Sequence, residues 1–180
     1  MYDKARKKSV LVGGQATLTS FPADTWTWDG TRWESAPGTT PGARIHYGLV
    51  YDHAGQRTLM FGGHDPVQRV NKGDTWTWTG SGWTPAAESI SPRTHAELGV
   101  TSSGVILMGG LNAASATLQF VSGVWRPATA TGGPGARYLT AMAYDAKRNV
   151  TVLFGGGDPA TDRLLDDTWE LGATGWRKIR

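Results

Sequence analysis

The sequence predicts an all-β fold built from four similar units, each of four short antiparallel strands. Pairs of glycine recur along the 180 residues at intervals of 49, 47 and 46, at 13–14, 62–63, 109–110 and 155–156. A short apolar run precedes each pair, and in three units a run that alternates tryptophan with polar residues follows it. A period of two between glycine-rich breaks is typical of antiparallel strands. A repeat near 47 residues with four strands per unit indicates a propeller or a comparable repeat array.

The second unit shows the pattern most completely. Its apolar strand at 57–61 runs into Gly62-Gly63, a polar loop follows, and residues 74–78 read Asp-Thr-Trp-Thr-Trp. The chain then turns through a Thr-Gly-Ser-Gly sequence into a further tryptophan. The first and fourth units repeat the Asp-Thr-Trp strand. A closing tryptophan ends every unit, at Trp33, Trp83, Trp125 and Trp176.

An arginine-led segment opens each later unit, with the arginine at 44, 93 and 137. We expect this segment to lead into the first strand of its unit. The third unit departs from the pattern, because residues 117–121 lack the Asp-Thr-Trp sequence and Thr-Ser-Ser-Gly at 101–104 replaces the Tyr-Asp turn. We therefore expect the third unit to fold like the others but with lower stability.

The order of arginine, apolar strand, diglycine, Asp-x-Trp and closing tryptophan resembles the kelch repeat, in the form found in bacterial galactose-oxidase-like propeller domains. The resemblance covers nearly the whole chain and implies a kelch-type β-propeller, with each unit one blade and the arginine-led strand innermost. The blades would span 1–40, 41–90, 91–134 and 135–180. The first blade would lack its inner strand, of which only Met1-Tyr2-Asp3 remains. Because such propellers have about six or seven blades, the resemblance implies part of a ring.

The recurring residues have structural roles in this interpretation. The diglycines let the backbone turn where neighbouring chains crowd together. Trp26, Trp76 and Trp169 are expected in the seams between blades, and the aspartate before each is expected to accept backbone N–H groups. The recurring arginines are expected to bond backbone carbonyls and aromatic faces. The structural set comprises Gly13, Gly14, Gly62, Gly63, Gly109, Gly110, Gly155, Gly156, Trp26, Trp33, Trp76, Trp83, Trp125, Trp169 and Trp176.

Residues that differ between the units are the candidates for function, because loops on a rigid scaffold usually carry recognition. The resemblance places on one face the loops 15–23, 64–73, 111–116 and 157–166, together with 36–43, 87–92 and 128–136. The ligand-binding candidates are His46, His64, Asp65 and His95, with the recurring Arg44, Arg93 and Arg137, for which a structural role is preferred. We predict a non-catalytic binding or scaffold domain that holds a protein or a glycan on this face.

The alternative is an enzyme, similar to a sugar epimerase, with a loop-built site at the propeller mouth. Its first candidates are Arg44, His46, His95 and Glu97. Copper radical oxidase chemistry is excluded, because its cofactor needs a cysteine and the chain has none. The histidines, including His53, lack the spacing of a metal site. No phosphate loop or serine-nucleophile motif occurs. We predict no catalytic residue, no metal and no cofactor.

The composition of the chain limits the classes of partner that it can be expected to bind. The net charge is +3 with scattered lysine and arginine, so nucleic acid is not expected. The basic run at 4–8 aligns with hairpin turns of other units, which favours a solvated turn over an anion site. No apolar run reaches the roughly 18 residues of a membrane span, and the apolar stretch near the start is too short for a signal peptide. The resemblance points outside the cytoplasm, although the residues themselves give no compartment.

An open array of blades would expose sheet edges and tryptophan faces at its ends. We therefore predict that the isolated chain closes into a small ring, associates with a second copy through its open blade edges, or has marginal stability.

Overall fold

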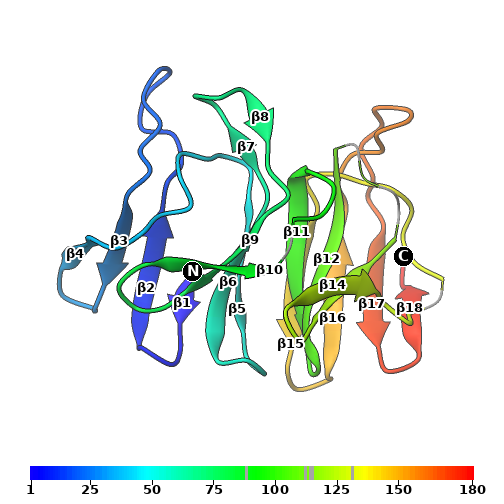
Figure 1. Ribbon diagram of the computed structural model, residues 1–180. Coiled ribbons are helices and arrows are strands. Elements are labelled where there is room, and N and C mark those ends of the chain that lie inside the picture. Colours follow the sequence, from blue (N-terminus) through cyan, green and yellow to red (C-terminus); the bar gives the residue numbers. More distant parts are fainter. Residues whose placement is uncertain (88, 112, 114–115, 131) are drawn as a thin grey trace. The chain divides into compact units, whose positions relative to one another are not determined.

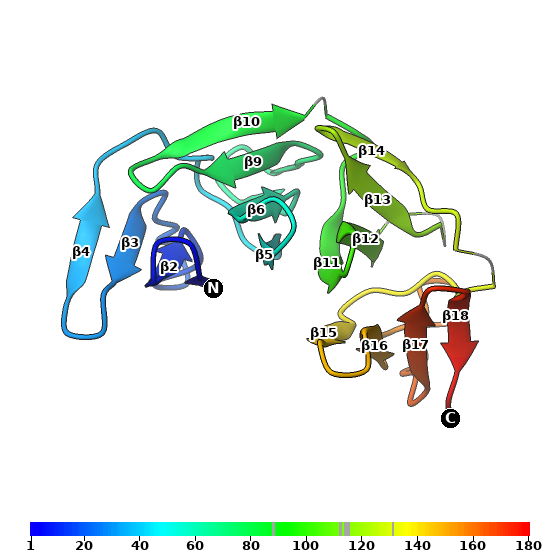
Figure 2. The ribbon, with the colours of Figure 1, turned by 90° about the horizontal axis from the view of Figure 1, so that it is seen from below.

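The computed structural model describes residues 1–87, 89–111, 113, 116–130 and 132–180, which form an all-β protein (Figure 1). Four four-stranded antiparallel sheets follow one another along the chain, and within each sheet the strands lie side by side in chain order (Figure 2). Sheet 1 contains β1 (Tyr2–Asp3), β2 (Lys8–Val12), β3 (Thr25–Trp28) and β4 (Trp33–Ala36). Sheet 2 contains β5 (Gly48–Asp52), β6 (Arg57–Phe61), β9 (Thr75–Trp78) and β10 (Trp83–Ala87).

The second half of the chain repeats this arrangement. Sheet 3 contains β11 (Thr94–Thr101), β12 (Gly104–Leu111), β13 (Leu118–Val121) and β14 (Val124–Pro127). Sheet 4 contains β15 (Ala141–Asp145), β16 (Val150–Phe154), β17 (Thr168–Gly172) and β18 (Gly175–Lys178). The predicted all-β architecture is confirmed, and the sheets are consistent with propeller blades. The chain divides into two compact units, and each is described by itself. The first unit, Met1–Thr94, contains sheets 1 and 2, and the second, His95–Arg180, contains sheets 3 and 4.

Three details refine the sequence-based expectation. The inner strand of the first sheet is the short remnant expected at 1–3: the two-residue β1 pairs with β2 through Tyr2↔Ser9 and Asp3↔Lys8. The polar loop after Gly63 contains a separate hairpin of β7 (His64–Asp65) and β8 (Val70–Asn71). Sheet 3 has all four strands despite its divergent sequence, while its lower stability stays a prediction. Parts of the predicted loops 87–92, 111–116 and 128–136 lie outside the described residues, at Glu88, Asn112, Ala114, Ser115 and Thr131.

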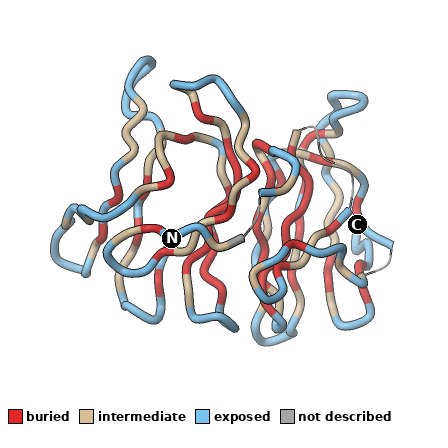
Figure 3. Tube along the Cα trace, in the orientation of Figure 1, coloured by how far each residue is buried: buried red, intermediate tan, exposed pale blue. Residues whose placement is uncertain are grey.

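Each unit has its own core, in the seam between two sheets. In the first unit the core consists of Val10, Val12, Met60, Trp78 and Trp83. In the second unit it consists of Ile106, Met108, Leu153, Leu171 and Trp176. Burial is most continuous along β6 and β12, which read as apolar runs (Figure 3).

In each unit, a closing tryptophan makes a hydrogen bond across the seam between the two sheets. The indole N–H of Trp83 donates to the hydroxyl of Thr25 at 3.0 Å, and Trp176 repeats this contact with Thr117 at 3.0 Å. Trp76 and Trp169 are partly buried against the same two cores, as predicted. The prediction for Trp26 is wrong: this side chain is 37% exposed, because no sheet of its own unit covers that face of sheet 1.

One hydrogen-bond network joins the motif residues of sheet 2. The Arg44 guanidinium donates to both carboxylate oxygens of Asp74, at 2.8 and 3.1 Å, and to the carbonyl of Gly62 at 3.0 Å. The Gly62 N–H donates to the Asp74 carbonyl at 3.0 Å, and the Trp76 indole donates to the Asp74 carboxylate at 2.7 Å. The aspartate was expected to accept backbone N–H groups, whereas its main partners are a guanidinium and an indole. Arg137, Gly155, Asp167 and Trp169 build the same network in sheet 4.

The first glycine of a diglycine lies close to the backbone of another segment. The φ angle of Gly109 is +65°, and a Cβ added there would lie 2.1 Å from the carbonyl oxygen of Arg137. The next residue, Gly110, donates its N–H to that same oxygen at 2.9 Å. Gly14 and Arg44 make the equivalent hydrogen bond in the first unit, at 3.1 Å. The predicted crowding at the diglycines is therefore confirmed, and its source is the backbone of the next arginine-led segment.

Candidate functional site

Two of the histidine candidates, His46 and His95, lie near the start of an inner strand. The third, His64, directly follows the diglycine 62–63. His46 and His95 lie two residues after their arginines and have φ angles of +56° and +59°, and Leu139 has +54° at the equivalent position in sheet 4. A recurring left-handed conformation in non-glycine residues marks a backbone bend imposed by the repeat. His46 is exposed and His95 is partly buried. These two residues belong to different units, and each is described within its own unit.

His64 and Asp65 fix the β7–β8 hairpin. His64 Nδ1 is 2.9 Å from Asn71 Oδ1, across the strand pair. The buried Asp65 carboxylate accepts the N–H groups of Val67 and Gln68 at 3.0 and 2.9 Å and pairs with Lys72 at 3.3 Å. Burial raises the pKa of Asp65, but these hydrogen bonds and the lysine outweigh it and lower the pKa overall. The contacts give both residues a structural role, and ligand binding by them stays a prediction.

The three recurring arginines are buried: Arg44, Arg93 and Arg137 are 1%, 8% and 3% exposed. The partners of Arg44 and Arg137 are internal carboxylates and carbonyls, which matches the structural role preferred from sequence. The carbonyl contacts that were predicted are present, and the carboxylate pairs were not foreseen. In sheet 3, Ala116 occupies the position that Asp74 has in sheet 2. Burial lowers the pKa of the Arg93 guanidinium.

Two further titratable candidates have distinct environments. Burial raises the pKa of Glu97 to about 7, and Glu97 lies on the same side of β11 as His95. No hydrogen bond or ion pair to Glu97 is found within the described residues. The ring of His53 packs edge-on against Tyr51 at 5.1 Å, and burial, followed by the charge of Lys4, lowers its pKa. Within the described ranges, no cluster of three or more histidine and acidic side chains could hold a metal ion.

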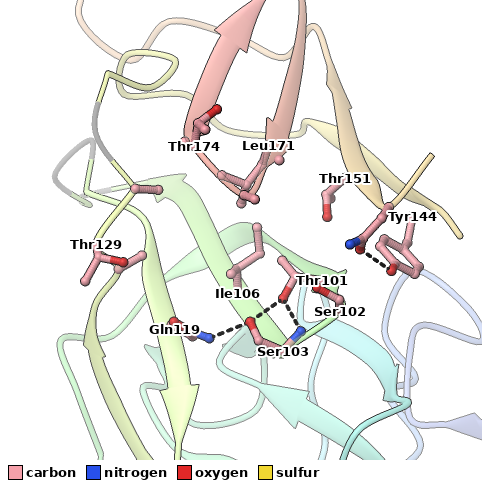
Figure 4. Close-up of a pocket in the computed structure, with 16 residues that line it drawn as sticks. Thr101, Ser102, Ser103, Ile106, Gln119, Thr129, Tyr144, Thr151, Leu171 and Thr174 are labelled. Carbon is pink, nitrogen blue, oxygen red and sulfur yellow. Dashed lines mark hydrogen bonds between the residues drawn. The ribbon is translucent and has the colours of Figure 1, made fainter.

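A pocket of about 230 Å³ lies between sheets 3 and 4 of the second unit (Figure 4). Three segments supply most of its wall: the β11–β12 turn, the residues after β14, and the β17–β18 turn. These turns lie at the opposite end of the sheets from the loop that follows Gly156 (Figure 1). The pocket is therefore at the other end of the sheets from the predicted loop 157–166, but it includes residues 128–130 of the predicted loop 128–136.

Neutral polar groups dominate the wall of the pocket, and none of its lining residues carries a formal charge. The hydroxyl- and amide-bearing residues are Thr101, Ser102, Ser103, Gln119, Thr129, Tyr144, Asn149, Thr151 and Thr174. Ile106 and Leu171 supply an apolar patch.

Internal hydrogen bonds hold part of this wall in place and leave part of it available. The Ser103 hydroxyl accepts from Gln119 Nε2 at 3.0 Å and lies 3.1 Å from the Thr101 hydroxyl, while Tyr144 donates to Asn149 Oδ1 at 2.7 Å (Figure 4). In the part of the chain that the structure describes, the hydroxyls of Ser102, Thr129 and Thr174 make no hydrogen bond. A ligand could therefore pair with these hydroxyls without breaking the internal bonds.

The pocket exists because the β11–β12 turn is short. The turn position at Asp3, Asp52 or Asp145 lies ten residues before the first glycine of its diglycine, at 13, 62 or 155, whereas Thr101 lies only eight before Gly109. In the first unit the longer turn carries Arg6, which bonds the Asp3 carboxylate and the Thr79 carbonyl, both at 2.9 Å. The basic run is an exposed turn, as expected, and Arg6 also reaches from sheet 1 to the outer turn of sheet 2.

A second difference enlarges the same space. Leu171 occupies the position at which sheet 2 has Trp78, so a smaller side chain faces the pocket. The Thr-Ser-Ser-Gly turn at 101–104 predicts only a loss of stability when it is taken from the sequence alone. The signal that could have found the pocket is the pairing of a turn shorter by two residues with the loss of its arginine.

Compared with known proteins, the chain matches no protein-family model and no curated protein. No helix in the described ranges is long and apolar enough to cross a membrane.

Proposed function

We propose that this chain is a non-catalytic binding module of the kelch-propeller type, whose pocket between sheets 3 and 4 holds a residue of a neutral glycan. The kelch-type architecture is supported by the four repeated four-stranded sheets and by the recurring Arg–diglycine–Asp–Trp network. Because one propeller architecture serves many functions, the ligand class is argued from the pocket alone.

The observation that carries the proposal is the chemistry of the pocket wall. Hydroxyl and amide side chains converge on a space in which no lining residue is charged. A charged ligand would lose its hydration there without gaining an opposite charge, which is costly. A sugar has hydroxyls that can both donate and accept, and its C–H face can lie against Ile106 and Leu171. The volume is below the roughly 300–1,000 Å³ of pockets for drug-sized ligands, so one sugar ring is the expected occupant.

The test is a binding screen on the full chain by saturation-transfer NMR. The probes are neutral mono- and disaccharides, with sialylated and sulfated sugars as charged counterparts. We expect neutral sugars to bind with modest affinity and the charged sugars to bind more weakly. Binding of the charged sugars alone, or of no sugar in the panel, would contradict the proposed ligand class.

Two substitutions locate the site. Leu171→Trp places in the pocket the residue that sheet 2 has at the equivalent position, so the fold should tolerate it while the pocket is filled. His46→Ala changes an exposed histidine of the first unit, a binding candidate from the sequence, and serves as the matched control. We expect Leu171→Trp to abolish sugar binding and His46→Ala to leave it unchanged. The reverse result would place binding on the loop face predicted from sequence.

A further inference from the structure

Sheet 1 presents an uncovered apolar face in its own unit. Leu11, Trp26 and Trp33 are 52%, 37% and 48% exposed, and the partly buried Trp28 lies beside them with its ring 5.6 Å from that of Trp33. The registers Leu11↔Trp26 and Trp28↔Trp33 place all four side chains on one side of the sheet. Single exposed apolar residues are ordinary, but a contiguous patch of this kind indicates an interaction surface.

The repeat shows what this face is built to contact. Counted from the diglycine and along the Trp strand, the four positions correspond in sheet 2 to Met60, Trp76, Trp78 and Trp83. In sheet 2 these residues pack against Val10 and Val12 of sheet 1, and Trp83 donates to Thr25. The same face of sheet 4 packs against Ile106 and Met108 of sheet 3, and Trp176 donates to Thr117. The structure therefore contains this interface twice.

Sheet 4 carries an uncovered face of the complementary kind. The positions of Val10, Val12 and Thr25 correspond there to Val152, Phe154 and Thr168. Phe154 is 54% exposed, and Val152 and Thr168 are only partly buried. On this face Glu170 replaces Thr27 and Arg177 replaces Glu34, and Glu170 pairs with Arg148 and Arg177 at 2.5 and 3.0 Å. This ion network neutralises the carboxylate, so the face keeps its apolar centre.

We propose that two copies of this chain associate head to tail, with the Leu11–Trp26–Trp28–Trp33 face of one copy packed on the Val152–Phe154–Thr168 face of the other. In this contact the Trp33 indole donates to the Thr168 hydroxyl, as Trp83 donates to Thr25 and Trp176 to Thr117. The contact is heterologous, because the two copies use different surfaces. It is independent of the sugar-binding proposal, since no pocket residue takes part.

The test is the mass of the full chain by sedimentation over a wide concentration range. We expect concentration-dependent association, with tryptophan fluorescence shifting to shorter wavelength as Trp33 leaves water. Trp33→Lys and Phe154→Lys should each raise the dissociation constant at least about tenfold, as expected for a central aromatic contact. Val67→Lys, at a highly exposed position of the β7–β8 hairpin, is the matched control and should have no effect. Circular dichroism checks that each variant folds.

Mixing the two lysine variants decides whether the contact is head to tail. The Trp33→Lys copy keeps an intact sheet 4 face, and the Phe154→Lys copy keeps an intact sheet 1 face, so together they can form one native contact. We expect the mixture to form a dimer that neither variant forms alone. A chain that is monomeric at every concentration, association that both variants leave unchanged, or a mixture without dimers would each overturn the proposal.

Discussion

The guanidinium of Arg137 donates hydrogen bonds of 2.8 and 3.2 Å to the two carboxylate oxygens of Asp167, which lies thirty residues later in the chain. Arg44 and Asp74 have the same separation and nearly the same geometry. In each case the arginine is buried, so the carboxylate is the countercharge that makes the burial tolerable. The strand that opens a sheet is thereby fastened to the loop entering its third strand.

Removing this countercharge should weaken the fold. Asp167→Asn leaves the buried guanidinium of Arg137 without an anion, and we expect a loss of about 3 kcal/mol in the free energy of unfolding. Urea denaturation followed by tryptophan fluorescence measures it. Asp24→Asn is the matched control, because the exposed Asp24 bonds the indole of Trp26 but no arginine within the described residues. Equal losses in the two variants would show that the indole contact, not the ion pair, is what stabilises the sheet.

The two kinds of glycine constraint can be separated by alanine. Gly109→Ala combines a left-handed φ with a collision against the Arg137 carbonyl, whereas Gly14→Ala at φ +100° meets nothing within 4 Å. The strain alone costs about 1–2 kcal/mol, and the collision adds to it because backbone cannot move aside. We expect Gly109→Ala to reduce the thermal midpoint several degrees more than Gly14→Ala. Similar midpoints would mean that the crowding at the arginine carbonyl relaxes freely.

Glu97 gives the stability a defined pH dependence. Burial raises its pKa to about 7 from the ordinary 4.5, so the folded state holds a proton that the unfolded state has released. Stability from this group is therefore full below about pH 4.5, falls as the pH rises to about 7, and is constant above it. The difference amounts to about 3 kcal/mol at most. Unfolding curves at pH 4, 6 and 8 should show Glu97→Gln gaining on the native chain as the pH rises. Parallel pH profiles would show that Glu97 ionises normally.

Lengthening the short turn should close the pocket. Replacing Thr101–Gly104 by the six-residue Asp3–Lys8 turn of the first unit restores the arginine that bonds the outer turn there. We expect sugar binding to disappear while the unfolding midpoint stays unchanged or rises. Binding is measured by the NMR screen and the midpoint by calorimetry. Retained sugar affinity in a folded variant would place the site elsewhere.

The sheets were predictable because their signals are local. Diglycines, period-two strands and closing tryptophans each occupy a few consecutive residues, and a fourfold repeat makes them hard to mistake. The exposure of Trp26 was missed, because a seam position is buried only where a neighbouring sheet covers it. The ion pairs join residues thirty apart, although the equal spacing of Arg44–Asp74 and Arg137–Asp167 was a readable sign.

The pocket lay beyond sequence reasoning for a different reason. The volume of the pocket depends on how much of the space between two sheets the side chains leave empty. A sequence pattern shows which side chains are present but not what space they leave. Leu171 stands where sheet 2 has Trp78, and the turn of sheet 3 has no equivalent of Arg6. Neither difference by itself indicates a pocket when the sequence is read alone. Only the folded seam shows that both changes open the same space.

The shortened turn between β11 and β12 also shows how duplicated units can diverge. Sheet 3 keeps all four strands although its β11–β12 turn is two residues shorter than the corresponding turns of the other sheets. Here two missing residues remove an arginine brace and expose hydroxyl groups that the scaffold already contained. The accessible hydroxyls follow from the absence of two turn residues, not from an added motif, so no run of consecutive residues signals them.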